Sequence, residues 1–142
     1  MSLFEDGIRE FILIFTDCAP YRLSKCLKKG YTHVYTLEKL EGMWLVFNPT
    51  RYGLDLYAPC SDKTDLVKRL KDNDTPITKA LHVLVTECKG GLIDPPQLLN
   101  CVTLAGYFMG VRFGLHELTP YRLYKSLLRR PRDGVSVKEI EL

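Results

Sequence analysis

The chain has 142 residues, of which 46% are hydrophobic and 26% charged, enough apolar material for the core of one soluble domain. Twenty Lys and Arg against 17 Asp and Glu leave a net charge of +3, too small to predict a nucleic-acid or anionic-membrane partner. No apolar run approaches the roughly 20 residues of a spanning helix. The first residues also lack the basic and apolar regions of a secretory signal. We therefore expect neither a membrane span nor secretion.

The five cysteines point to reduced thiols. They stand at positions 18, 26, 60, 88 and 101, an odd number with no Cys-x-x-Cys pair. This spacing argues against a disulfide framework and against a zinc site built from cysteines. We expect free thiols in a cytosol, with no metal and no cofactor.

The pattern of apolar runs and turn residues predicts an α+β protein. In chain order it predicts a strand over residues 9–16, a helix over 21–29, strands over 31–38, 43–47 and 53–57, a helix starting at 61–65, a strand over 79–87, and helices over 100–109 and 119–129. Gly30 suits a helix end, and Pro49 is expected to end the ladder of its hairpin because proline has no N–H to donate. Thr119-Pro120 gives the clearest helix start, a hydroxyl N-cap followed by proline.

Together these elements predict an antiparallel sheet of four to five strands with helices packed beside it. Residues 1–130 are expected to form a single domain. Residues 131–142 carry few apolar side chains, so we expect a loose C-terminal tail.

Cys101 has the best setting for a reactive thiol. Pro95 and Pro96 interrupt regular structure before it, and Asn100 is a suitable N-cap, so Cys101 is expected in the first turn of a helix. The unpaired N–H groups and the positive end of the helix dipole stabilise an anion there. We therefore expect its pKa to be lowered toward neutrality, which would make it a nucleophile. The plainer interpretation is a small buried thiol.

A thiol nucleophile needs a base and a group that orients the base. Among the three histidines, His33 is the most constrained, because the interior of a strand fixes the direction of its ring. The neighbouring strand ends in Asn48, which could hydrogen-bond the far ring nitrogen. The plainer interpretations are a histidine satisfied by a carbonyl and a turn-forming Asn before proline.

A His on one strand, an Asn on the next and a Cys opening a packed helix resemble the papain-like arrangement. With the Cys last in the chain, the order is similar to the circularly permuted branch of the NlpC/P60 superfamily, which includes the lecithin–retinol acyltransferase-like proteins. In that branch an Asn-Cys pair opens the helix, as Asn100-Cys101 does here. In the acyltransferase relatives an acidic residue and a His follow the Cys. Here Val102 and Thr103 stand in their place, which leaves the acyl substrate open.

The wider layout also resembles a group of small phage-encoded proteins, over roughly residues 9 to 128. The shared segments are Phe15-Thr16-Asp17, Gly30-Tyr31-Thr32-His33, Trp44 through Asn48-Pro49, Cys101-Val102 and Thr119-Pro120-Tyr121-Arg122-Leu123-Tyr124. The resemblance implies a host-cytoplasmic or virion location.

The sequence leaves two functions open, and a third function with weaker support. The first is a cysteine hydrolase or acyltransferase acting on amide or thioester bonds of peptides or peptidoglycan through Cys101, His33 and Asn48. The second is a non-catalytic virion or assembly component that contacts other phage structural proteins. The third is an inhibitor or adaptor of a host enzyme. No nucleic-acid partner is expected.

A basic cluster lies near the C-terminus, at Lys125, Arg129, Arg130 and Arg132. It could contact phosphate or an acidic partner. A solvated helix end that complements the helix dipole is the plainer interpretation.

Overall fold

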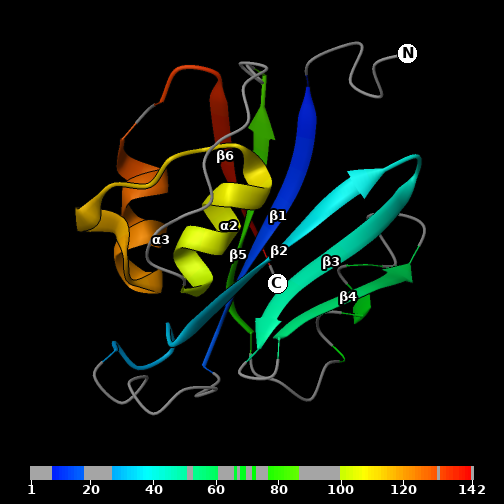
Figure 1. Cartoon of the computed structure of the whole chain (residues 1–142), viewed down its shortest axis with the longest axis horizontal. Coiled ribbons are helices and arrows are strands. Elements are labelled where there is room, and N and C mark those ends of the chain that lie inside the picture. The colour runs from blue at the N-terminus through cyan, green and yellow to red at the C-terminus, as the bar shows by residue number, and fades with distance from the viewer. Residues whose placement is uncertain are drawn as a thin grey trace.

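The computed structural model describes residues 8–17, 27–50, 53–60, 77–86, 100–130 and 132–141, together with Leu66, Lys68, Arg69 and Asp72. In these parts of the chain a six-stranded antiparallel sheet carries two α-helices (Figure 1). Its elements are β1 (Arg9–Thr16), β2 (His33–Leu40), β3 (Met43–Thr50), β4 (Gly53–Cys60), β5 (Ile77–Val85), α2 (Cys101–Met109), the 3₁₀ turn η2 (Leu115–Glu117), α3 (Pro120–Arg129) and β6 (Val135–Ile140).

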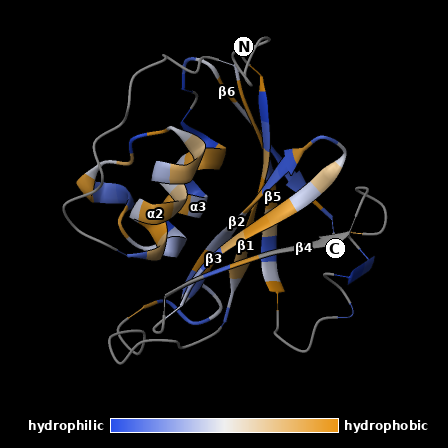
Figure 2. Ribbon diagram, turned by 45° about the vertical axis from the view of Figure 1, so that its right-hand side comes forward, coloured by the Kyte–Doolittle hydropathy of each residue, from blue (hydrophilic) through white to orange (hydrophobic). Residues whose placement is uncertain are grey.

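The strands lie in the order β4-β3-β2-β1-β5-β6, so β1 is central. All residues from 11 to 16 are buried, which explains why this strand is a continuous apolar run instead of an alternating one. Alternate side chains enter two cores. Phe11, Leu13 and Phe15 point to one face, and Ile12 and Ile14 point to the other. Figure 2 shows the hydrophobic middle of β1 in orange.

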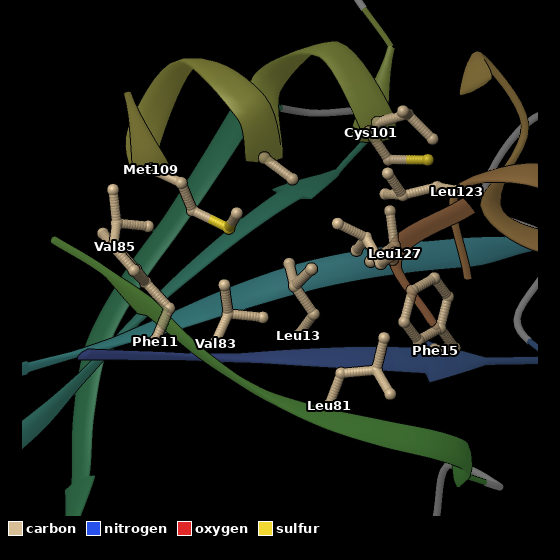
Figure 3. Packing of buried hydrophobic residues seen from close by; sticks show 13 residues of the cluster. Phe11, Leu13, Phe15, Leu81, Val83, Val85, Cys101, Met109, Leu123 and Leu127 are labelled. Carbon is tan, nitrogen blue, oxygen red and sulfur yellow. The ribbon is translucent and has the colours of Figure 1, made fainter. Parts of the chain in front are cut away.

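Both helices cover the face that carries Phe11, Leu13 and Phe15 (Figures 1 and 3). Cys101 and Met109 extend from α2 into this core, and Cys101 lies beside Leu123 of α3 in Figure 3. Helix α2 packs chiefly against β2, which brings its first residue to the strand that begins at His33. No helix in the described residues is long and apolar enough to cross a membrane.

The prediction of an α+β sheet with packed helices is confirmed, but the sheet has six strands where four to five were expected. The additional strand, β6, lies in the segment predicted to be a loose tail. It pairs with β5 along its whole length, and Val135 and Val137 pack against the helix-side core. An edge strand needs only one apolar face, so few apolar residues suffice to place it.

Pro49 lies beyond the ladder that joins β3 to β2, as predicted, but β3 itself continues to Thr50. The pairing of β3 with β2 stops at Phe47 opposite Thr36, while Pro49 pairs with Leu54 of β4. The missing N–H of proline therefore falls where β2 no longer accepts hydrogen bonds from β3.

Asn100 and Thr119 cap α2 and α3 as expected. Most of the helix predicted over 21–29, and the helix start at 61–65, lie outside the described residues.

Candidate functional site

The N-terminus of α2 is held by a reciprocal set of hydrogen bonds. The Thr103 N–H donates to Asn100 Oδ1 at 2.8 Å, and the Asn100 N–H donates to Thr103 Oγ1 at 2.9 Å. Asn100 Nδ2 also donates to the Leu118 carbonyl at 3.3 Å, which connects this helix end to the turn before α3. Because the cap is fixed from both sides, Cys101 is the first residue of a well-defined helix.

His33 and Asn48 meet at the open end between β2 and β3. His33 is the first residue of β2, and Asn48 lies past the last pair that joins the two strands. His33 Nε2 donates to Asn48 Oδ1 at 2.8 Å. Since a carbonyl oxygen only accepts, the hydrogen is on Nε2, and Nδ1 of the neutral ring carries the lone pair.

The other ring nitrogen of His33 is buried and unsatisfied. His33 is 4% exposed, and within the described residues Nδ1 has no hydrogen-bond partner. Burial lowers the pKa of His33 below its ordinary value of 6.5, and the hydrogen bond that the ring donates to Asn48 offsets part of this effect. The ring is therefore a neutral base at neutral pH, with its lone pair unused.

The Cys101 thiol lies against the backbone of β2. Backbone hydrogen bonds from Val34, Val102 and Cys101 itself act on the sulfur and lower its pKa, as expected at a helix start. Burial is the larger effect, since Cys101 is only 8% exposed, and it raises the pKa above the ordinary value of 9.0. The predicted lowering of the pKa is therefore wrong in direction. At rest Cys101 is a neutral thiol.

The structure joins His33 to Asn48 by a hydrogen bond, and it places Cys101 against Val34, the residue that follows His33 in β2. The Val34 nitrogen that faces the sulfur is two covalent bonds from the His33 Cα. Val34 belongs to the same core as Cys101. The His33 ring instead shares the side of Tyr35, with their centroids 6.3 Å apart. Within the described residues no hydrogen bond joins sulfur and ring, and the two side chains lie toward opposite faces of the sheet, so the structure does not bring Cys101 and His33 into contact.

The other two histidines have different partners. His82 Nε2 bonds Glu10 Oε1 at 2.7 Å on the strands β5 and β1. His116, in η2, lies 3.3 Å from the Arg130 guanidinium. Each contact ties the ring to another element of the fold, and neither contact involves Cys101.

Glu117 is a buried carboxylate that the sequence did not single out. Its side chain is 1% exposed and accepts from Ser126 Oγ at 2.5 Å, from the Gly114 N–H at 2.7 Å and from the Arg132 guanidinium. These bonds tie the turn before α3 to the helix and to the segment that leads into β6. No local motif distinguishes Glu117 from the exposed glutamates, so only the packing reveals it.

Aromatic rings border the start of β2. The Tyr31 ring lies 5.0 Å from that of Tyr121 and 5.2 Å from that of Tyr124. The Tyr124 hydroxyl donates to Glu139 at 3.0 Å, and desolvation together with this contact raises the pKa of Tyr124 to about 12. These rings occupy the end of the molecule where α3 meets the strand of His33.

No group of three or more His, Cys, Asp or Glu that could hold a metal ion occurs within the described part of the chain. Comparison with models of known protein families, with curated proteins and with solved structures found no match. The functional argument therefore rests on the residues themselves.

Proposed function

We propose that the chain is a cysteine hydrolase or acyltransferase of phage origin with a permuted papain-like arrangement, similar to the NlpC/P60 superfamily. One observation carries this proposal. A buried histidine is held by an Asn through Nε2, keeps an unused lone pair on Nδ1, and precedes the residue whose amide faces the Cys101 thiol. A base oriented by a third group and a thiol at a helix start are the parts of a nucleophile triad, and the proposal requires the His33 ring to turn from the Tyr35 side of the sheet toward the sulfur.

The lowered pKa of His33 and the raised pKa of Cys101 favour a neutral pair at rest. In the proposed reaction His33 Nδ1 takes the thiol proton as the sulfur attacks the carbonyl carbon of an amide or thioester. The Cys101 N–H donates to the oxyanion that forms. The imidazolium then gives its proton to the leaving amine or thiol, which leaves an acyl group on sulfur. Water, or an acceptor nucleophile in an acyl transfer, releases that group with His33 again as base.

The role of Asn48 is to keep the proton on Nε2. While Nε2–H donates to Oδ1, the neutral ring has its lone pair on Nδ1 alone. The same bond strengthens when the ring becomes cationic, because charge-assisted hydrogen bonds are stronger than neutral ones. Asn48 is therefore a positioning residue and does not touch the substrate.

Alkylation tests the proposal directly. Iodoacetamide is added to the folded protein between pH 5 and 9, and labelling of each cysteine is followed by peptide mass spectrometry. We expect Cys101 to react faster than Cys88 because His33 takes its proton, with an inflection below about pH 6.5, where His33 becomes the neutral base. His33→Gln keeps a donor for Asn48 but removes the base, so the inflection should vanish while the fold is retained. Equal rates for the two cysteines without an inflection would overturn the proposal.

One observation favours a second candidate, a non-catalytic virion or assembly component. Cys101 is 8% exposed and its pKa is raised by burial, as for a thiol that only fills space. In that case Cys101→Ala should retain function in phage assembly. For the thiol enzyme the same variant should be inactive although folded, since the nucleophile is lost.

A further inference from the structure

Helix α3 carries basic side chains on the face turned away from the core. Arg122, Lys125 and Arg129 follow a spacing of three and four residues, which places them on one side of a helix. The opposite side, with Leu123 and Leu127, is buried in the helix-side core. Arg122 and Arg129 are exposed and Lys125 is half-buried. In Figure 1, α3 lies at the outer margin of the helical layer.

The same side chains line a shallow cavity of about 300 Å³. Its lining residues are His116, Arg122, Lys125, Ser126, Arg129 and Arg130, and none of them is acidic. Past Lys125, the basic surface continues to Lys28 around the Tyr121 ring. The ammonium of Lys28 lies 3.8 Å, and that of Lys125 4.7 Å, from the centre of this ring. We call Lys28, Arg122, Lys125, Arg129 and Arg130 the basic band.

Nearby carboxylates do not neutralise the basic band. Glu117 lies beneath it but is buried and bonded to Ser126 and Arg132. Glu139 pairs with Lys79 and accepts from Tyr124. Within the described residues, none of the five cations of the band has a carboxylate at ion-pair distance. No described carboxylate therefore pairs with these charges.

We propose that the basic band binds the phosphodiester backbone of a single nucleic-acid strand. The band is elongated, since seven residues separate Arg122 from Arg129, or about 10 Å along the helix. A single small phosphate would need donors that converge on one point, whereas successive phosphates match a row of cations. Three of the five cations are arginines, whose planar fork suits phosphate oxygens. A single strand can follow one helix face of this length.

The binding is independent of base sequence. The Tyr121 ring contacts both Lys28 and Lys125, so it is not free to stack on a base. The total charge of +3 led to the expectation of no nucleic-acid partner, but that sum does not show how folding groups the charges. The proposal does not depend on the thiol chemistry.

Fluorescence anisotropy with a labelled 20-nucleotide oligo(dT) tests the band in the full-length protein. We expect affinity to fall with salt with a logarithmic slope of about −2 to −3, for three to four phosphate contacts. Arg122→Gln and Arg129→Gln should each reduce the slope by about 0.7 and weaken binding about eightfold at 50 mM salt. Lys138→Gln removes an equal charge from the exposed strand β6 and should leave binding unchanged.

Three results would overturn the proposal. One is the absence of binding at 20 mM salt. Another is an equal loss for Lys138→Gln and Arg129→Gln, which would mean that only total charge matters. The third is tighter binding of poly-glutamate than of the oligonucleotide, which would assign the band to an acidic polypeptide. Far-ultraviolet circular dichroism of each variant verifies that it is folded, and the expected weakening of binding in a folded Arg129→Gln protein supports the proposal.

Discussion

Replacing Asn48 with alanine removes the acceptor of the buried Nε2–H of His33. His33 is 4% exposed, so water cannot take the place of Oδ1 at 2.8 Å without opening the structure. A buried donor left unsatisfied costs about 1–3 kcal/mol. For a chain of this size that corresponds to a decrease of roughly 3–9 °C in the melting temperature. Asp55 lies opposite Asn48 in the ladder and is exposed, so Asp55→Ala should change stability by less than about 0.5 kcal/mol.

Urea unfolding at pH 7 and at pH 5.5 measures both the loss and its cause. Asn48→Asp places a carboxylate at the same position and should raise the pKa of His33, because an opposite charge favours the imidazolium. The Asp variant should therefore lose less stability than the wild type when the pH is lowered. If Asn48→Ala unfolds at the same urea concentration as Asp55→Ala, and Asn48→Asp shows the pH dependence of the wild type, the bond between His33 and Asn48 does not exist in solution.

Three further predictions follow from buried groups. Because the pKa of His33 is below 6.5 in the folded chain, the unfolded chain takes up a proton first, so stability should fall as the pH is lowered through 6.5. His33→Gln should remove that part of the pH dependence in urea titrations, and an unchanged profile would assign it elsewhere. Gly106→Ala should lower the free energy of unfolding by about 1–3 kcal/mol, since the new Cβ would lie 2.6 Å from a backbone oxygen. Gly42→Asn is the control and should lower it less, because a Cβ at Gly42 has nothing within 4 Å. Equal melting temperatures for the two variants would contradict this prediction. Glu117→Gln should lower the free energy of unfolding by about 1–3 kcal/mol. This is less than the cost for a fully buried ion pair, because the arginine partner of Glu117 is 23% exposed. A urea midpoint equal to that of the wild type would contradict the prediction.

Elements with a strong local signal were predicted well. The run of β-branched and aromatic residues over 9–16 is strand β1 with the predicted bounds. The caps at Asn100 and Thr119 set the starts of α2 and α3, because a side chain that bonds the first free N–H groups is a property of the adjacent residues alone.

Elements that depend on a distant partner were predicted less well. Strand β6 has a weak pattern of its own and is ordered by pairing with β5, 50 to 60 residues earlier in the chain. Pro49 was expected to end the ladder, and the pairing with β2 does stop before it, but β3 continues to Thr50 along β4. The order of β6 and the extension of β3 both depend on a neighbouring strand in the sheet and not on the local residues alone.

In the candidate site, too, a feature set by neighbouring strands was predicted, whereas one that depends on distant residues was not. The pairing of His33 with Asn48 was expected from adjacent hairpin strands, and the structure contains that hydrogen bond. The pKa of Cys101 was expected to be low from its helix position. Its burial raises it instead, because desolvation depends on how many atoms from other elements surround the sulfur.

By itself, the order of residues determined where chain segments start, turn and cap, and which side chains alternate along each strand. Only the tertiary structure decided how far the sheet extends, how deeply the thiol is buried, and that five cations gather on and beside α3 with no described carboxylate at ion-pair distance. The reason is physical. Caps and periodicity act over a few neighbouring residues, whereas desolvation and charge clustering depend on groups brought together from distant parts of the chain.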